Sequence, residues 1–120
     1  MIKMYKALCF ALQGISYAWN NERAFRQEVV VSLILIPIAY KITGNLEAFV
    51  VLICSLIFVM IIELLNTAIE KAVDRIGTES HNLAKVAKDC GAAATLLAII
   101  LCTLIWIPKL YNYFTTISSL

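Results

Sequence analysis

The sequence has 120 residues, of which 62% are hydrophobic and 15% are charged, and its mean hydropathy is +0.86. This composition excludes an ordinary soluble domain, in which close to half of the residues are apolar and about a quarter are charged. The formal net charge of +2 is too small to indicate a nucleic-acid-binding protein. We therefore expect an all-α integral membrane protein that forms one domain over residues 1–120.

The first predicted element is an amphipathic helix over residues 1–19. Its large apolar side chains recur at helical spacing, at Tyr5, Leu8, Leu12, Ile15 and Trp19. The apolar part is short and interrupted, so a helix lying in the headgroup region fits it better than a signal peptide does. Trp19 suits the membrane interface.

A polar stretch over residues 20–28 follows this helix. A solvated elbow is the simpler interpretation, but Glu22 and Glu28 abut apolar sequence on both sides, where an elbow needs only caps and cations. The first membrane span is predicted over residues 28–43. Its apolar part is short for a span, so we expect the polar turn at Gln27 and Glu28 to extend the helix.

The second span is predicted over residues 46–76, with Asn45 as its N-cap and Gly77 as its stop. At 1.5 Å per residue this helix is about 45 Å long, which exceeds the hydrocarbon core, so its end must emerge into the headgroups. The third span is predicted over residues 83–108. Its small residues 91–94 allow close backbone approach, either for helix packing or for a ligand.

Basic residues set the predicted orientation. Eight of them lie before the first span, in the last turns of the second or in the first turns of the third: Lys3, Lys6, Arg23, Arg26, Lys71, Arg75, Lys85 and Lys88. The other side carries Lys41 and Lys109. By the positive-inside rule, the N-terminus is cytoplasmic and the motif residues meet at one cytoplasmic surface.

The second span carries a polar stripe. On a helix that advances about 100° per residue, Glu63, Asn66, Glu70 and Asp74 fall within a stripe about 80° wide. An acid near the centre of a membrane helix costs roughly 2.5–3.5 kcal/mol, while each large apolar residue returns about 0.3–0.6. The apolar run over residues 48–62 can therefore carry Glu63, and an acid at this depth is expected to be functional.

Carboxylates from three segments converge on this surface: Glu22, Glu28, Glu63, Glu70, Asp74 and Asp89. Without matching histidines or thiolates they suit Mg²⁺, and Lys88 beside Asp89 adds a cation for polyphosphate. An interfacial charge pair is the simpler interpretation of Lys88 and Asp89, and a loop histidine that of His81. No phosphate-binding glycine loop is present, so a nucleotide site must be built another way.

Four segments resemble the prokaryotic diacylglycerol kinase family in order and spacing, and the likeness covers nearly the whole chain. They are Asn21-Glu-Arg-Ala-Phe-Arg-Gln-Glu28, Glu63-Leu-Leu-Asn-Thr-Ala-Ile-Glu70, Val73-Asp-Arg-Ile-Gly77 and Ala87-Lys-Asp89. The same family includes undecaprenol kinases. The Phe-Arg-Gln-Glu and Asp-Arg-Ile-Gly forms are closer to its diacylglycerol branch.

The resemblance implies an ATP-dependent kinase that phosphorylates the hydroxyl of diacylglycerol to give phosphatidic acid in a bacterial inner membrane. It implies a homotrimer of protomers with a surface helix and three spans, in which one protomer's elements complete another's site. Carried over by position, Glu22 and Glu70 hold Mg²⁺ on the ATP phosphates. Glu63 serves as general base or orienting acceptor at the lipid hydroxyl, and Asn66 orders the site.

The resemblance also assigns the remaining contacts. The other nucleotide-binding residues are Lys3, Glu79, His81, Lys88 and Asp89, and the lipid contacts are Ala24, Phe25, Arg26, Gln27, Glu28 and Glu63. The chain departs from the family at Lys3, where an Arg is frequent, and at Phe10 and Ser80, where aromatic hydroxyls are frequent. The rivals to a diacylglycerol kinase are an undecaprenol kinase, a small oligomeric ion or proton conductor, and an inactive assembly subunit.

Overall fold

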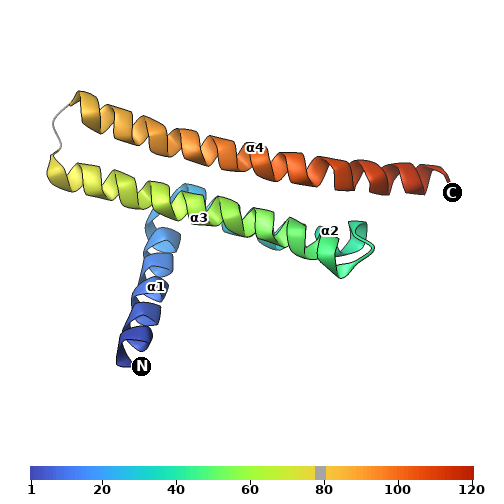
Figure 1. Cartoon of the computed structure of the whole chain (residues 1–120), viewed down its shortest axis with the longest axis horizontal. Coiled ribbons are helices and arrows are strands. Elements are labelled where there is room, and N and C mark those ends of the chain that lie inside the picture. Colours follow the sequence, from blue (N-terminus) through green and yellow to red (C-terminus); the bar gives the residue numbers. More distant parts are fainter. Residues whose placement is uncertain (78–80) are drawn as a thin grey trace.

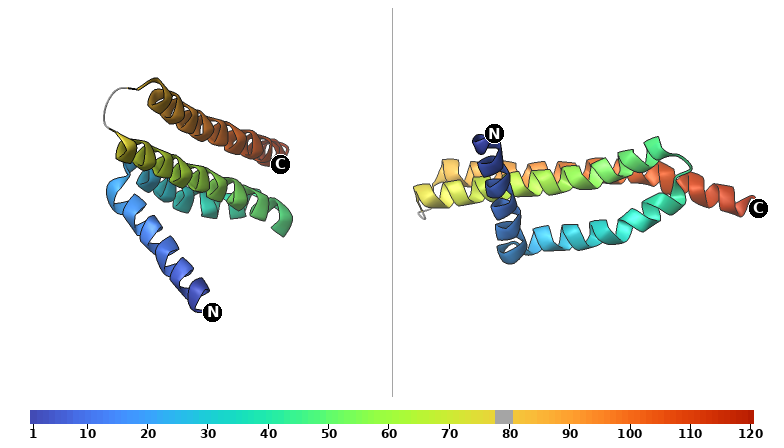
Figure 2. Two further views of the ribbon diagram at one scale, coloured as in Figure 1. Left: turned by 60° about the vertical axis from the view of Figure 1, so that its left-hand side comes forward. Right: turned by 90° about the horizontal axis from the view of Figure 1, so that it is seen from below.

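Four helices make up the fold of the computed structural model, which describes residues 1–77 and 81–120. They are α1 (Ile2–Asn21), α2 (Arg23–Ile42), α3 (Leu46–Ile76) and α4 (Asn82–Ser118). α3 and α4 lie side by side in opposite directions, and α2 packs on α3 (Figure 1). α1 projects away from the other three helices, as the views of Figure 2 also show. The arrangement leaves one face of α1 free of contact with the bundle.

A single residue separates α1 from α2. The backbone of Glu22 is extended, with φ −114° and ψ 107°, while the residues on both sides are helical. The guanidinium of Arg26 donates hydrogen bonds to the carbonyl oxygens of Trp19 at 3.0 Å and Asn20 at 3.2 Å, which satisfies carbonyls that the end of α1 leaves unpaired. The polar stretch is therefore helical around one break and is not a solvated elbow.

Side chains cap the two long helices. Asn45 Oδ1 accepts a hydrogen bond from the backbone N–H of Ala48 at 2.8 Å, which confirms the predicted N-cap. His81 Nδ1 accepts one from the N–H of Leu83 at 3.0 Å and so caps α4. α3 ends at Gly77, as predicted, and the φ of 179° at this residue is extended backbone open to any residue.

Of the helices described, α3 and α4 are long and apolar enough to cross a membrane. α2 is long enough at 20 residues but is not among them, because it carries the charged residues Arg23, Arg26, Glu28 and Lys41. α4 continues through Pro108 to Ser118, past the predicted end at residue 108. Its 37 residues make it about 55 Å long, well beyond a hydrocarbon core of about 30 Å.

The buried apolar residues gather where α2, α3 and α4 meet, at Ala39, Leu52, Leu56 and Trp106. Within this cluster the indole Nε1 of Trp106 donates to Ser55 Oγ at 2.9 Å, and Ser55 Oγ donates to the carbonyl oxygen of Leu52 at 2.6 Å. Ser55 is 3% exposed and Trp106 is 6% exposed. This chain of hydrogen bonds ties α4 to α3 inside an otherwise apolar contact.

Replacing Ser55 with alanine is expected to lower the free energy of unfolding by about 1 kcal/mol, because the buried indole N–H loses its acceptor. Reversible unfolding of the purified protein in mixed detergent micelles measures this. Thr116→Val is the matched control, since the Thr116 hydroxyl is exposed and donates to the carbonyl of Asn112 in its own helix. An equal loss in both variants would contradict a specific role for the Ser55 contact.

Candidate active site

The polar stripe of α3 turns toward the neighbouring helices. Glu63 is 7% exposed and Thr67 is 8% exposed, so the acid lies on the packed face of α3. Further along, the side-chain amide of Asn66 donates to Glu70 Oε1 at 3.4 Å. The stripe thus runs from a buried carboxylate to a half-buried one over two helical turns.

Glu28 on α2 lies opposite Glu63. Both carboxyl groups face the same cavity, and Thr95 on α4 reaches it from the third side. All three residues line a cavity of about 460 Å³ between α2, α3 and α4, together with Ala24 and Gln27. Glu28 Oε2 is buried and has no hydrogen-bond partner within residues 1–77 and 81–120. Three helices therefore surround one acidic cavity with apolar walls.

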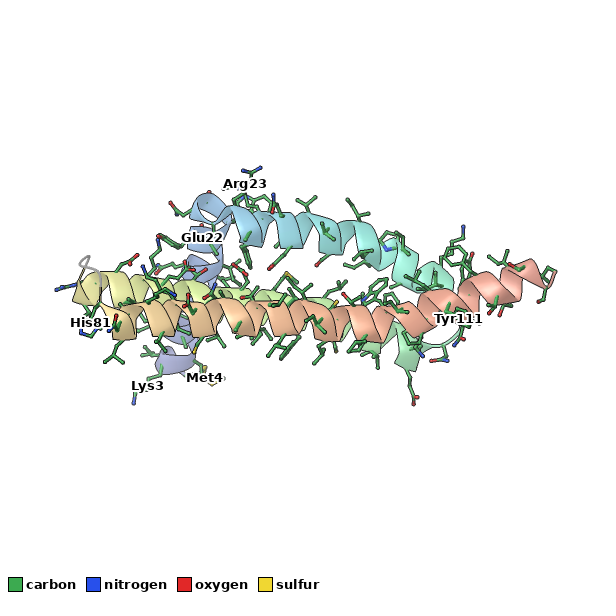
Figure 3. All side chains as sticks on the ribbon, turned by 90° about the horizontal axis from the view of Figure 1, so that it is seen from above. Lys3, Met4, Glu22, Arg23, His81 and Tyr111 are labelled. Atoms are coloured by element: carbon green, nitrogen blue, oxygen red, sulfur yellow. The ribbon has the colours of Figure 1, made fainter. Side chains whose placement is uncertain are left out.

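Glu22 joins this region from the α1–α2 break. Its Oε1 lies 3.7 Å from Nζ of Lys71, the residue after Glu70 on α3. Figure 3 shows Glu22 at the α1–α2 junction beside the ends of α3 and α4, with Arg23 on the outer side. The extended backbone at Glu22 is what turns this acid toward α3. Glu22 therefore lies beside the C-terminal part of α3, the part that carries Glu70.

The arrangement of the acids limits the kind of metal site that they could form. Among the described residues, no three His, Cys, Asp or Glu side chains come close enough together to hold a metal ion. Mg²⁺ is often bound by one or two carboxylates together with substrate phosphates and water. Glu22 and Glu70, both half-buried carboxylates beside an exposed lysine, fit that kind of site and do not fit a metal cage made of protein alone.

Asn66 fits into a space that Gly91 provides on α4. Gly91 is buried, and a Cβ built on it would overlap Asn66 Oδ1. That oxygen is itself buried and has no hydrogen-bond partner in the described part of the chain. The glycine therefore lets the amide reach the α3–α4 contact, where its Nδ2 faces Glu70.

Gly91→Ala is expected to reduce turnover by about 10- to 100-fold, because Asn66 must rotate away and small misplacements near reacting groups have effects of that size. Steady-state assays of the reconstituted protein test this. Gly14→Ala is the matched control, since a Cβ at Gly14 meets nothing within 4 Å. Unchanged turnover in a folded Gly91→Ala protein would contradict the positioning of Asn66.

The first turns of α4 carry the basic part of the site. Lys88 Nζ lies 2.7 Å from Asp74 Oδ1 on α3, and Lys85 Nζ lies 2.6 Å from Asp89 Oδ2. Nearby, His81 lines a cavity of about 460 Å³ with residues from the end of α3 and the start of α4. Glu79, the other predicted nucleotide contact in this region, lies outside the described residues.

Some predicted site residues lie elsewhere. Lys3 is exposed near the free end of α1, on the other side of α3 and α4 from Glu22 in the view of Figure 3. The predicted lipid segment is split between surfaces. Ala24, Gln27 and Glu28 line the acidic cavity, whereas Phe25 is 3% exposed and packs in an apolar cavity with Trp19. Arg26 is bound to the end of α1.

The sequence did not reveal two of these contributions. Thr95 stood in an apolar run with no distinguishing pattern. Arg26 was predicted as a lipid contact, and its spacing of six and seven residues from two helix-terminal carbonyls was the available signal for its hydrogen bonds to α1. The Lys85–Asp89 pair could have been found from its i, i+4 spacing.

The helices and this site define a small all-helical protein with two apolar helices of membrane-spanning length and an acidic cavity flanked by lysines. Residues 9–110 match the prokaryotic diacylglycerol kinase family. The diacylglycerol kinase of Escherichia coli strain K12 is 45% identical over 112 residues, which are 93% of this chain and 92% of that protein. The chain therefore belongs to the prokaryotic diacylglycerol kinase family.

Further relatives agree. The diacylglycerol kinase of Haemophilus influenzae is 41% identical over 97 residues, covering 81% of this chain and 82% of that protein. The diacylglycerol kinase of Pseudomonas aeruginosa is 38% identical over 104 residues, covering 87% and 85%. Similarity thus extends over the acidic stripe of α3 and the lysines of α4.

Proposed function

We propose that this protein transfers the γ-phosphoryl group of ATP to the hydroxyl of diacylglycerol, giving phosphatidic acid. The observation that carries the proposal is the buried carboxylate of Glu63 in an apolar-walled cavity, next to a cluster of acids and lysines at the helix ends. A lipid alcohol and a charged nucleotide must meet at such a boundary. Membership of the diacylglycerol kinase family supports the same reaction.

We propose that α2, α3 and α4 are three membrane spans and that α1 is an amphipathic surface helix, with the N-terminus cytoplasmic in a bacterial inner membrane. Large apolar side chains face outward on these helices, such as Leu33 at 62% exposed and Leu104 at 66%. Such surfaces suit lipid or a neighbouring protomer. As the resemblance to the family implies, the assembly proposed here is a homotrimer in which adjacent protomers share each site.

In the proposed mechanism, Glu22 and Glu70 would hold Mg²⁺, and the ion would supply charge neutralisation for the ATP phosphates. Lys88 contacts the phosphates and Asp89 the nucleotide, as phosphoryl transfer depends mostly on positioning and charge compensation. Asn66 keeps Glu70 oriented through its amide hydrogen bond. Glu79, His81 and Lys3 complete the nucleotide contacts.

On the lipid side, Ala24 to Glu28 contact the substrate, and Ala24, Gln27 and Glu28 do so through the acidic cavity. Glu63 accepts the proton of the lipid hydroxyl or orients that hydroxyl toward the phosphate. The apolar walls of the cavity exclude water from the reacting oxygen. Exclusion of water favours transfer to the lipid over hydrolysis of ATP.

The test is an assay with ATP labelled at the γ-phosphate and purified protein in mixed micelles that contain diacylglycerol and undecaprenol together. The expected product is labelled phosphatidic acid, formed in excess over undecaprenyl phosphate. Preferential labelling of the polyprenol would make the protein an undecaprenol kinase. Ion flux in liposomes without ATP, with no labelled lipid, would contradict a kinase and support a conductor.

A further inference from the structure

Two ion pairs lie near the C-terminus of α3 and the N-terminus of α4. One is formed within α4 and the other joins the two helices. The Lys85–Asp89 pair joins residues one turn apart on α4 at 2.6 Å. The Lys88–Asp74 pair joins α4 to α3 at 2.7 Å, across 14 positions of the sequence. The second pair therefore fixes where the Lys88 ammonium lies relative to the polar stripe of α3.

Stability does not account for the cross-helix pair. The side chains of Lys88 and Asp74 are 45% and 51% exposed, and exposed ion pairs of this kind contribute little to folding. The packing of α3 on α4 is supplied elsewhere, by the apolar cluster around Trp106 and Leu52. What the pair does accomplish is to restrict a long, flexible side chain to one place.

That place is next to the proposed phosphate site. Asp74 follows Glu70 by one helical turn on the same face of α3, so a lysine held by Asp74 lies alongside Glu70. An ammonium has three N–H donors, and Asp74 Oδ1 takes one of them. Within residues 1–77 and 81–120 the other two have no partner, and they can bind phosphate oxygens.

We propose that Asp74 is a positioning residue for Lys88: it holds the ammonium over the acidic end of α3 so that the ATP phosphates meet an ordered cation. The inference rests on the proposed function, because it assigns Lys88 to the phosphates. A lysine that becomes ordered only when ATP binds loses rotamer freedom at that step, which weakens binding. Because Asp74 already orders Lys88 in the free protein, ATP binding does not bear this entropy cost. Asp74 itself contacts neither substrate.

Asp74→Asn is expected to raise the KM for ATP by about tenfold, which corresponds to the ordering of one lysine side chain. The kcat and the KM for lipid should change by less than about twofold. Asp74→Glu keeps the charge and should restore most of the ATP affinity. Glu47→Gln is the matched control, because it removes an exposed acid from the opposite end of α3.

Binding of a non-hydrolysable ATP analogue with Mg²⁺ provides a readout independent of turnover. In a Lys88→Gln background, Asp74→Asn should cause no further loss of analogue affinity, since Asp74 acts through Lys88. An additional loss in that background would overturn the inference. So would an unchanged or lowered KM for ATP in Asp74→Asn, or an equal fall in kcat.

Failure of the proposed function gives a different pattern. If the wild-type protein phosphorylates no lipid, the kinase assignment is wrong whatever Asp74 does. If the wild-type protein is active and Asp74→Asn matches it in KM and analogue affinity, only the positioning role is wrong. Should Asp74→Asn fail to fold, Asp74→Ala takes its place in both measurements, because alanine also removes the carboxylate that holds the ammonium.

Discussion

Glu63→Gln is expected to reduce phosphoryl transfer to diacylglycerol by at least about 100-fold, the lower end of what a positioned general base contributes. Glu63 is the only buried acid in the described part of the chain, at 7% exposed. Glutamine keeps its size and can fill the same space, but it cannot accept the hydroxyl proton. Binding of Mg²⁺ and the ATP analogue should stay within about threefold of the wild type, because the proposed nucleotide contacts are elsewhere.

The measurement pairs initial rates in mixed micelles with equilibrium binding of the analogue, on protein shown to be assembled. Glu47→Gln again serves as the control, since it makes the same change at an exposed position. A Glu63→Gln protein that is assembled and turns over at the wild-type rate would exclude Glu63 as the base. Loss of analogue binding together with turnover would instead place Glu63 in the nucleotide site.

The second large effect is expected at the metal. Glu22→Gln and Glu70→Gln should each lower kcat/KM for ATP by about 100-fold or more, because phosphoryl transfer depends on the divalent cation that these carboxylates are proposed to hold. The Mg²⁺ concentration that gives half-maximal rate should rise by about tenfold or more, since a hard cation loses one of two anionic ligands. Rates measured across a Mg²⁺ titration at fixed ATP test both expectations.

High Mg²⁺ separates two roles for these acids. Recovery of the wild-type rate at saturating Mg²⁺ would mean that Glu22 and Glu70 only bind the cation, while a persistent loss would mean that they also orient it. Arg23→Gln is the neighbouring control for Glu22, because Arg23 lies on the outer side of α2 (Figure 3). A Mg²⁺ dependence unchanged in both glutamate variants would contradict the proposed metal ligands.

The sequence predicted the local features of this fold well, because they depend on neighbouring residues. The helical period placed Glu63, Asn66 and Glu70 on one face of α3, and the structure gives α3 as an unbroken helix from Leu46 to Ile76. Asn45 precedes an apolar run with the chemistry of an N-cap, and it forms that cap. Such features need no knowledge of the other helices.

The exact break between α1 and α2 was harder to predict. Every residue from Asn20 to Glu28 tolerates a helix, so composition could not show that only Glu22 leaves helical geometry. The hydrogen bonds from Arg26 to the carbonyls at the end of α1 stabilise the break at Glu22, and they form only once α1 and α2 have docked. A polar segment with no proline or glycine gave no signal for its turning point.

The contacts between α3 and α4 also could not be predicted from the sequence. Gly91 faces Asn66, Asp74 pairs with Lys88, and Trp106 binds Ser55 only because the antiparallel helices pack in one register. That register depends on the shapes of many apolar side chains at once. The sequence predicted Gly91 as a place of close approach, but not which side chain would use the space.

The most direct test of the account is the position of a divalent cation in crystals of the protein with a non-hydrolysable ATP analogue and Mn²⁺ in place of Mg²⁺. Anomalous scattering locates Mn²⁺ without reference to the protein density. The account predicts one Mn²⁺ per site, coordinated by the carboxylates of Glu22 and Glu70 and by phosphate oxygens, with Lys88 on the same phosphates. A cation bound to the nucleotide but remote from both glutamates would contradict it.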